Sequence, residues 1–110
     1  MKYTRETAID LCNLIKPIAI KHGWCVGITG SCLFKGESDN DMDIILYPYG
    51  IEGKKTRSTS KKCLDAIVEL LGTVVDRDCI DLKYSPAKEV NIIEFEKYGK
   101  IDFFIFQPLE

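Results

Sequence analysis

The chain has 110 residues, of which 45% are hydrophobic and 29% are charged. A chain of this length builds one modest core, and this composition is ordinary for a globular protein. The formal net charge of −2 argues against a surface built for long nucleic acids, because such surfaces carry an excess of Lys and Arg. We therefore expect residues 1–110 to form a single domain. The basic residues between 54 and 62 would form either a small local patch or a solvated loop and first helical turn.

Cysteine usage and the start of the chain bear on its compartment. The cysteines are odd in number, form no C-x-x-C pair and are accompanied by one histidine, His22, so we predict no zinc site. Residues 1–10 are largely polar, and no apolar run is long enough to cross a bilayer. Free thiols in a reducing compartment favour a cytoplasmic protein that does not enter a membrane. The five cysteines are Cys12, Cys25, Cys32, Cys63 and Cys79.

The spacing of apolar residues predicts an amphipathic helix over residues 4–21. Thr4 is a suitable N-cap, and we expect Pro17 to bend the helix and Gly23 to end it. Thr7 stands where a full capping box has Glu or Gln, so no such box is expected. The apolar face of this helix consists of Leu11, Leu14, Ile15 and Ile18.

A second helix and six strands complete the predicted fold. Ser58, Thr59 or Ser60 would cap this helix, and Gly72 would end it. The polar segments over 30–40 and 50–58 read as a turn and a loop. Tyr98-Gly99 would turn the last two strands into a hairpin. The element order predicts an α+β fold in two layers, a mixed sheet with both main helices on one face. The strands are expected over 24–29, 42–47, 73–75, 79–84, 90–95 and 100–106.

Three aspartates carry most of the functional signal. Asp41 and Asp43 are two residues apart at the start of a predicted strand, so both project from one face of the sheet. Asp102 lies in an otherwise apolar strand, where a carboxylate is costly unless it is paired, exposed or metal-bound. Mg²⁺ or Mn²⁺ suits such oxygen ligands and is completed by water and substrate phosphates. We predict that these aspartates bind divalent metal and form the catalytic centre.

The turn before these aspartates suits a phosphate. At Gly30 the backbone can approach a phosphate closely, and the Ser31 hydroxyl can donate to it. Alone, a Gly-Ser pair is usually an ordinary turn, and an Asp-x-Asp pair is usually a solvated strand end. Together, a phosphate cradle, a two-metal site and a third carboxylate indicate phosphoryl or nucleotidyl transfer.

Residues 29–46, T-G-S-C-L-F-K-G-E-S-D-N-D-M-D-I-I-L, resemble the G-S and D-x-D pattern of the nucleotidyltransferase superfamily. Their spacing is similar to that of the palm domain of family X (polymerase β-type) DNA polymerases. Residues 4–8 also resemble a P-R-E-E-A helix start in that family, and residues 94–102 resemble the hairpin with its third aspartate. The resemblance implies a nucleotidyltransferase palm-like domain over residues 1–110.

The resemblance also implies an activity and a role for each aspartate. The enzyme would transfer a nucleoside monophosphate from an NTP or dNTP to a hydroxyl and release pyrophosphate. Asp41 and Asp43 would hold both metal ions, and Asp102 would hold the catalytic ion and help to deprotonate the attacking hydroxyl. The acceptor would be a nucleic acid 3′ end or a protein.

For the triphosphate, the resemblance implies binding by Gly30 and Ser31. Family X carries arginines where this chain has Leu33 and Phe34, so Lys35 would have to supply the contact to pyrophosphate. The domains with which family X enzymes grip template and primer are not in this sequence, so we expect no templated synthesis by these residues alone.

Two other functions stay open. The chain would be a non-catalytic palm remnant that binds nucleotide, metal or a protein, or an antitoxin-like minimal nucleotidyltransferase that acts on a partner protein. Strand alternation places an apolar patch beside the aspartates. A homo-oligomer or a partner protein would cover it, or else residues 48–58 and 107–110 would fold over it. The patch consists of Ile45, Tyr47, Phe104 and Phe106.

Overall fold

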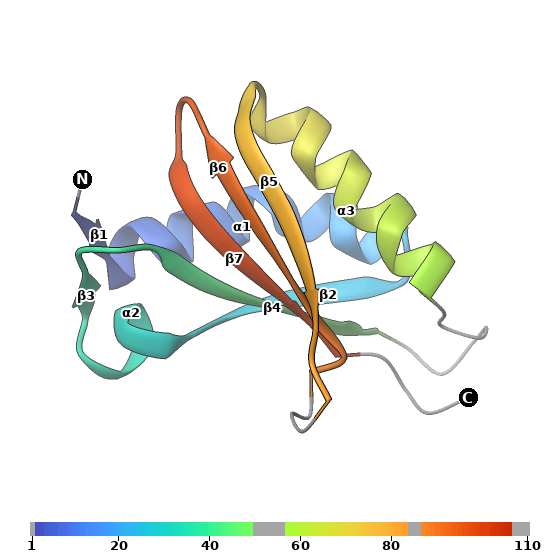
Figure 1. The fold of residues 1–110 in the computed structure, drawn as a ribbon, viewed down its shortest axis with the longest axis horizontal. Coiled ribbons are helices and arrows are strands. Elements are labelled where there is room, and N and C mark those ends of the chain that lie inside the picture. The colour runs from blue at the N-terminus through green and yellow to red at the C-terminus, as the bar shows by residue number, and fades with distance from the viewer. Residues whose placement is uncertain (1, 50–56, 84–86, 107–110) are drawn as a thin grey trace.

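Two long helices cover one face of a mixed five-stranded sheet (Figure 1). The computed structural model describes residues 2–49, 57–83 and 87–106. The elements, in chain order, are β1 (Tyr3–Thr4), α1 (Arg5–Lys21), β2 (Trp24–Thr29), α2 (Gly30–Phe34), β3 (Glu37–Ser38), β4 (Met42–Pro48), α3 (Arg57–Leu71), β5 (Val74–Asp81), β6 (Glu89–Phe95) and β7 (Gly99–Ile105).

The sheet has the strand order β2-β4-β7-β6-β5, and β1 pairs separately with β3. Neighbouring strands of the large sheet are antiparallel except β4 and β7, which are parallel. Alternate residues of the central strands point toward the helices and form the core, as expected for a sheet with one covered face. The predicted two-layer α+β fold is therefore confirmed. The core residues of β4 and β7 are Met42, Ile44, Leu46, Ile101, Phe103 and Ile105.

The start of α1 differs from the sequence prediction. Thr4 Oγ1 accepts a hydrogen bond from the Thr7 backbone N–H at 3.1 Å. Thr7 Oγ1 in turn accepts one from the Thr4 N–H at 3.0 Å, so a capping box is present. Our expectation of no box was wrong, because a threonine hydroxyl takes the part usually played by Glu or Gln. At the other end α1 stops at Lys21, and Gly23 follows with a positive φ of 81°.

Two further segments differ from prediction. Residues 30–34 form the short helix α2 rather than a turn. The two strands expected over 73–75 and 79–84 are one strand, β5, with a register shift between Val74 and Asp76, and residue 84 lies outside the described residues. The charged stretch between the two predicted strands belongs to β5. It does not interrupt the strand, because β5 is an edge strand and its side chains are mostly exposed.

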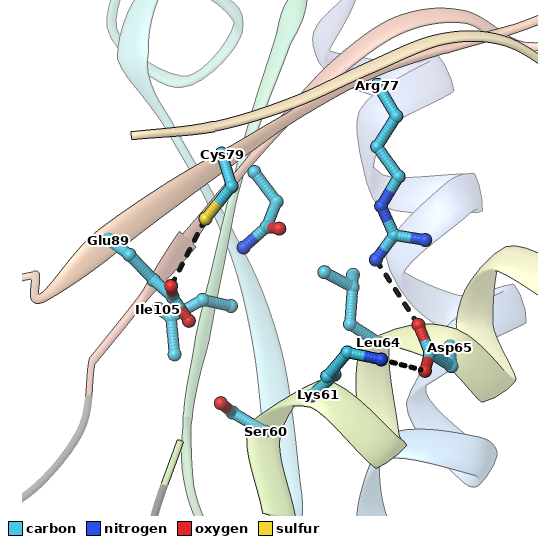
Figure 2. Close-up of a pocket in the computed structure, with 9 residues that line it drawn as sticks. Ser60, Lys61, Leu64, Asp65, Arg77, Cys79, Glu89 and Ile105 are labelled. Atoms are coloured by element: carbon cyan, nitrogen blue, oxygen red, sulfur yellow. Dashed lines mark hydrogen bonds and ion pairs between the residues drawn. The ribbon is translucent and has the colours of Figure 1, made fainter. Parts of the chain in front are cut away.

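The edge strand is joined to the helical layer by an ion pair. Arg77 Nη2 of β5 lies 3.3 Å from Asp65 Oδ1 of α3 (Figure 2). The helix α3 begins at Arg57, earlier than an N-cap at residues 58–60 would place it, and Gly72 follows its last residue with φ 99°. Most of the predicted loop over 50–58 lies outside the described residues.

The other face of the sheet carries the predicted apolar patch. Ile45 and Phe104 pair directly across β4 and β7, on the face away from the helices. Tyr47 is 38% exposed, so part of the patch reaches the surface. A homo-oligomer or partner protein that would cover this face remains a prediction.

Within residues 2–49, 57–83 and 87–106, no helix is both long and apolar enough to span a membrane.

Candidate metal and nucleotide site

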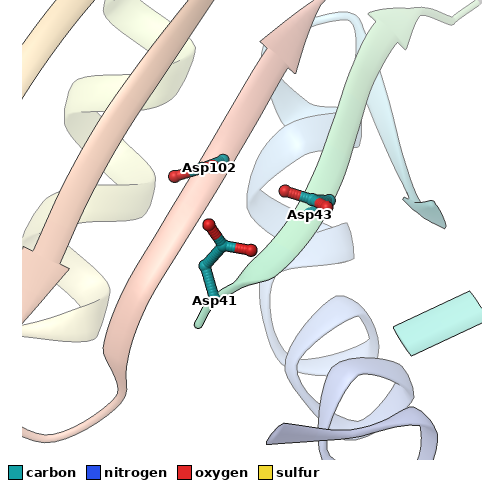
Figure 3. A group of neighbouring side chains, drawn as sticks. All are labelled: Asp41, Asp43 and Asp102. Atoms are coloured by element: carbon teal, nitrogen blue, oxygen red, sulfur yellow. The ribbon is translucent and has the colours of Figure 1, made fainter. Parts of the chain in front are cut away.

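The register of two parallel strands creates a cluster of three carboxylates. Asp43 of β4 lies directly opposite Asp102 of β7, and Asp41 immediately precedes β4. The three side chains point toward one another on the open face of the sheet (Figure 3). One carboxylate oxygen from each lies within 4.8 Å of the other two, and all three residues are half-buried. The structure thus brings together the three aspartates that the sequence singled out.

Burial and mutual repulsion oppose ionisation of this cluster. Burial, with the charge of Asp41 adding to it, raises the pKa of Asp43 to about 6. Burial also raises the pKa of Asp102 to about 7, and hydrogen bonding to Asp41 and the charges of both neighbours add to the effect. The positive charge of Lys100 opposes both shifts. Without a further cation, the cluster therefore retains a proton near neutral pH.

The cluster has the donor set of a divalent metal site. Its ligand atoms are all carboxylate oxygens, which Mg²⁺ and Mn²⁺ prefer over softer donors. Asp102 Oδ1 is buried and has no hydrogen-bond partner in the structure. An orphaned buried acceptor is costly, and a bound cation would satisfy it. Asp41, Asp43 and Asp102 therefore fit a divalent ion.

Gly30 lies against the cluster. Its backbone has a positive φ of 66°, and a Cβ at this position would overlap the Oδ2 atom of Asp43. The preceding residue, Thr29, pairs with Asp43 across β2 and β4, which explains the close approach. Only glycine fits both the backbone conformation and the space. Ser31 follows in the first turn of α2, where its carbonyl accepts the Lys35 N–H at 2.8 Å.

Lys35 does not reach the carboxylates. Its side chain is exposed at the end of α2, and among the described residues it forms no ion pair with Asp41, Asp43 or Asp102. The basic residue whose charge acts on the cluster is Lys100, which sequence reasoning missed. The available signal was spacing, because residues two apart on a strand share a face and Lys100 precedes Asp102 by two.

The turn between β2 and β4 is held from outside by α1. Arg5 Nη2 donates to the Leu33 carbonyl at 2.6 Å, and the Arg5 backbone N–H donates to the Gly36 carbonyl at 2.9 Å. Ser38 Oγ accepts from the Asp41 N–H at 3.4 Å, immediately before β4. These contacts fix the segment that carries Gly30 and Asp41, and Arg5 is a positioning residue that the sequence did not single out.

No family model matches the chain, and no curated protein matches it. Among solved structures, a chain of the GLD-2/RNP-8 complex is similar over 92% of this chain, with a TM-score of 0.59 and 15% sequence identity. The chain has a nucleotidyltransferase-like fold. The chain spans 32% of the length of the matched chain. At 15% sequence identity, the similarity shows a shared fold alone.

The raised pKa values predict how stability depends on pH and metal. The folded protein binds protons at Asp43 and Asp102 more tightly than an unfolded chain, whose aspartates have the ordinary pKa of 3.8. The metal-free protein is therefore expected to lose stability as pH rises from about 4 to about 7, and the loss levels off above the folded values. Mg²⁺ at pH 8 is expected to recover it.

Thermal unfolding across this pH range, with chelator or with Mg²⁺, measures the effect. The double variant Asp41→Asn, Asp43→Asn serves as the control and should flatten the part of the profile that is due to the cluster. A melting temperature that does not respond to Mg²⁺ at pH 8 would mean that the carboxylates do not form a metal site.

Proposed function

We propose that the chain is a metal-dependent nucleotidyltransferase that transfers a nucleoside monophosphate from an NTP or dNTP to a hydroxyl and releases pyrophosphate. The observation that carries the proposal is the grouping of three carboxylates within 4.8 Å, beside Gly30, on a nucleotidyltransferase-like fold. The spacing from Ser31 to Asp41 further favours a palm domain of the family X type.

In this proposal each aspartate has a separate role. Asp41 and Asp43 would hold both Mg²⁺ or Mn²⁺ ions, which when bound stabilise charge on the attacking and leaving oxygens. Asp102 would hold the catalytic ion and accept the proton of the attacking hydroxyl.

The triphosphate would lie at the start of α2. Gly30 would let the backbone approach it, and Ser31 would donate its hydroxyl and backbone N–H. The charge of Lys100 acts on Asp43 and Asp102, so we assign to Lys100, rather than to Lys35, the task of balancing negative charge at the site.

A partner for the open sheet face belongs to the same proposal. GLD-2 occurs in a complex with RNP-8, and this chain has an apolar patch at Ile45, Tyr47 and Phe104 beside its carboxylates. We propose that a second copy of the chain or a partner protein covers this patch, and the acceptor hydroxyl is either a nucleic acid 3′ end or a protein side chain.

The test is transfer of label from a nucleotide. The protein is incubated with Mg²⁺ or Mn²⁺, α-labelled NTPs or dNTPs, and oligonucleotide or protein acceptors, beside the double variant Asp41→Ala, Asp43→Ala. Label transfer that the variant loses supports the enzyme. Metal-dependent nucleotide binding without transfer to any acceptor favours a non-catalytic binding module. If the protein neither binds nucleotide nor transfers label, the enzyme and the nucleotide-binding module are both ruled out.

A further inference from the structure

A cavity lies on the helix-covered face of the sheet, between the first half of α3 and the strands β5, β6 and β7 (Figure 2). We call it the α3–β5 cavity. Its volume is about 380 Å³, which is within the range of small-molecule sites in proteins. Because Asp102 lies on the opposite face of β7, this cavity is separate from the carboxylate cluster.

Two polar side chains of β6 line the α3–β5 cavity in an otherwise well-buried region. Glu89 and Asn91 are two residues apart on the face that also carries the core residue Ile93, and each is only 7% exposed. Asn91 lines the cavity beside Glu89. The side chain of Glu89 has one polar partner there, the Cys79 thiol, whose Sγ donates to Oε2 at 3.3 Å.

A buried carboxylate paired only with a thiol is unusual, because a buried charge is stable only when it is compensated. The two basic residues that line the cavity form ion pairs with Asp65 rather than with Glu89. Lys61 Nζ and Arg77 Nη2 each lie 3.3 Å from a carboxylate oxygen of Asp65 (Figure 2). No described basic residue forms an ion pair with Glu89.

The lining also has an apolar part. Leu64 of α3 and Ile105 of β7 are 2% and 1% exposed and contribute carbon surface to the cavity. A ligand that fits therefore has an apolar body and a head with several N–H donors. A positive head suits Glu89, because the described basic residues of the lining pair with Asp65 and none forms an ion pair with Glu89.

We propose that the α3–β5 cavity binds a small organic cation, with an amidinium, guanidinium or ammonium head that donates to the Glu89 carboxylate and the Asn91 amide oxygen. A charged N–H group donating to a carboxylate forms the stronger class of hydrogen bond, and a planar amidinium can make two in parallel. The apolar body of the ligand packs on Leu64 and Ile105. This site is independent of the proposed transferase activity.

The test compares two probes of the same shape. Benzamidine is a planar cation, and benzamide is its neutral counterpart. We expect NMR titration of the full chain to show that benzamidine binds at least about tenfold more tightly, because a charged hydrogen bond is worth more than a neutral one. The backbone amide signals that shift should lie in β6, in β5 near Cys79 and in the first half of α3.

Matched variants locate the effect. Glu89→Gln keeps the side-chain shape and removes the charge, so it should abolish the preference for benzamidine. Glu94→Gln removes a charge from the opposite face of the same strand and should keep the preference, as should Asp102→Asn. Equal binding of the two probes by the wild-type protein, or shifts confined to other elements, would overturn the proposal even if Glu89→Gln fails to fold. So would a folded Glu89→Gln protein that keeps the full preference.

Discussion

Asp102→Asn is expected to lower nucleotidyl transfer by more than about 100-fold and, at pH 8 without metal, to raise the melting temperature. Changes to groups that only orient a metal ligand already cost 10- to 100-fold, and Asp102 is assigned as a ligand itself. The stability gain follows from charge. Above pH 7 the wild-type site holds three carboxylates without a metal, and asparagine keeps the shape while removing one charge.

The opposite signs of the two effects make this prediction specific. A merely structural role for Asp102 would lower activity and stability together. Asp78→Asn is the matched control, because Asp78 lies on the same row of the sheet, two strands away through Ile92, and is exposed. It should change neither quantity. Asp102→Asn with wild-type transfer, or with lower stability than the wild type at pH 8 in chelator, would contradict the proposed site.

Gly30→Ala is expected to destabilise the protein by at least about 2 kcal/mol and to disable the site. Part of the cost is the left-handed backbone, which disfavours a residue with a Cβ by about 1–2 kcal/mol. The other part is the overlap of that Cβ with the Asp43 carboxylate, which forces Asp43 or α2 to move. Chemical denaturation measures the loss of stability. Loss of Mg²⁺-dependent stabilisation measures the damage to the site.

Gly72→Ala separates these two costs. Gly72 also has a positive φ, 99°, but a Cβ there would have no neighbour within 4 Å. We expect the Gly72 variant to lose stability through its backbone alone and to keep its full response to Mg²⁺. If both variants respond to Mg²⁺ like the wild type, Gly30 does not shape the carboxylate site.

The local elements were predictable where sequence pattern and environment agree. The strand predicted over 24–29 is confirmed with the same bounds in β2, and the end of α3 at Leu71 follows from the glycine after it. The predictions for β5 and α2 were wrong for different reasons. Charged residues did not interrupt β5 because an edge strand leaves them in solvent, and the polar segment after Thr29 coils into α2.

Some features of the functional site were also predictable from the sequence, and others were not. From spacing alone, Asp41 and Asp43 share one strand face and Asp102 is an unexplained charge in an apolar strand. Spacing could not pair Asp43 with Asp102, because the sequence does not state which strands are neighbours, and the parallel register of β4 and β7 decides it. The effect of Lys100 on Asp43 depends on that same register.

The sequence by itself determined the two layers of the fold, the covered faces of its strands and the three aspartates, because periodicity fixes which way each side chain points. Only the tertiary structure decided that their oxygens meet within 4.8 Å and that Gly30 must lack a side chain. It also decided the α3–β5 cavity. Glu89 and Asn91 look ordinary in the sequence, and their burial beside this cavity is decided by the folded chain.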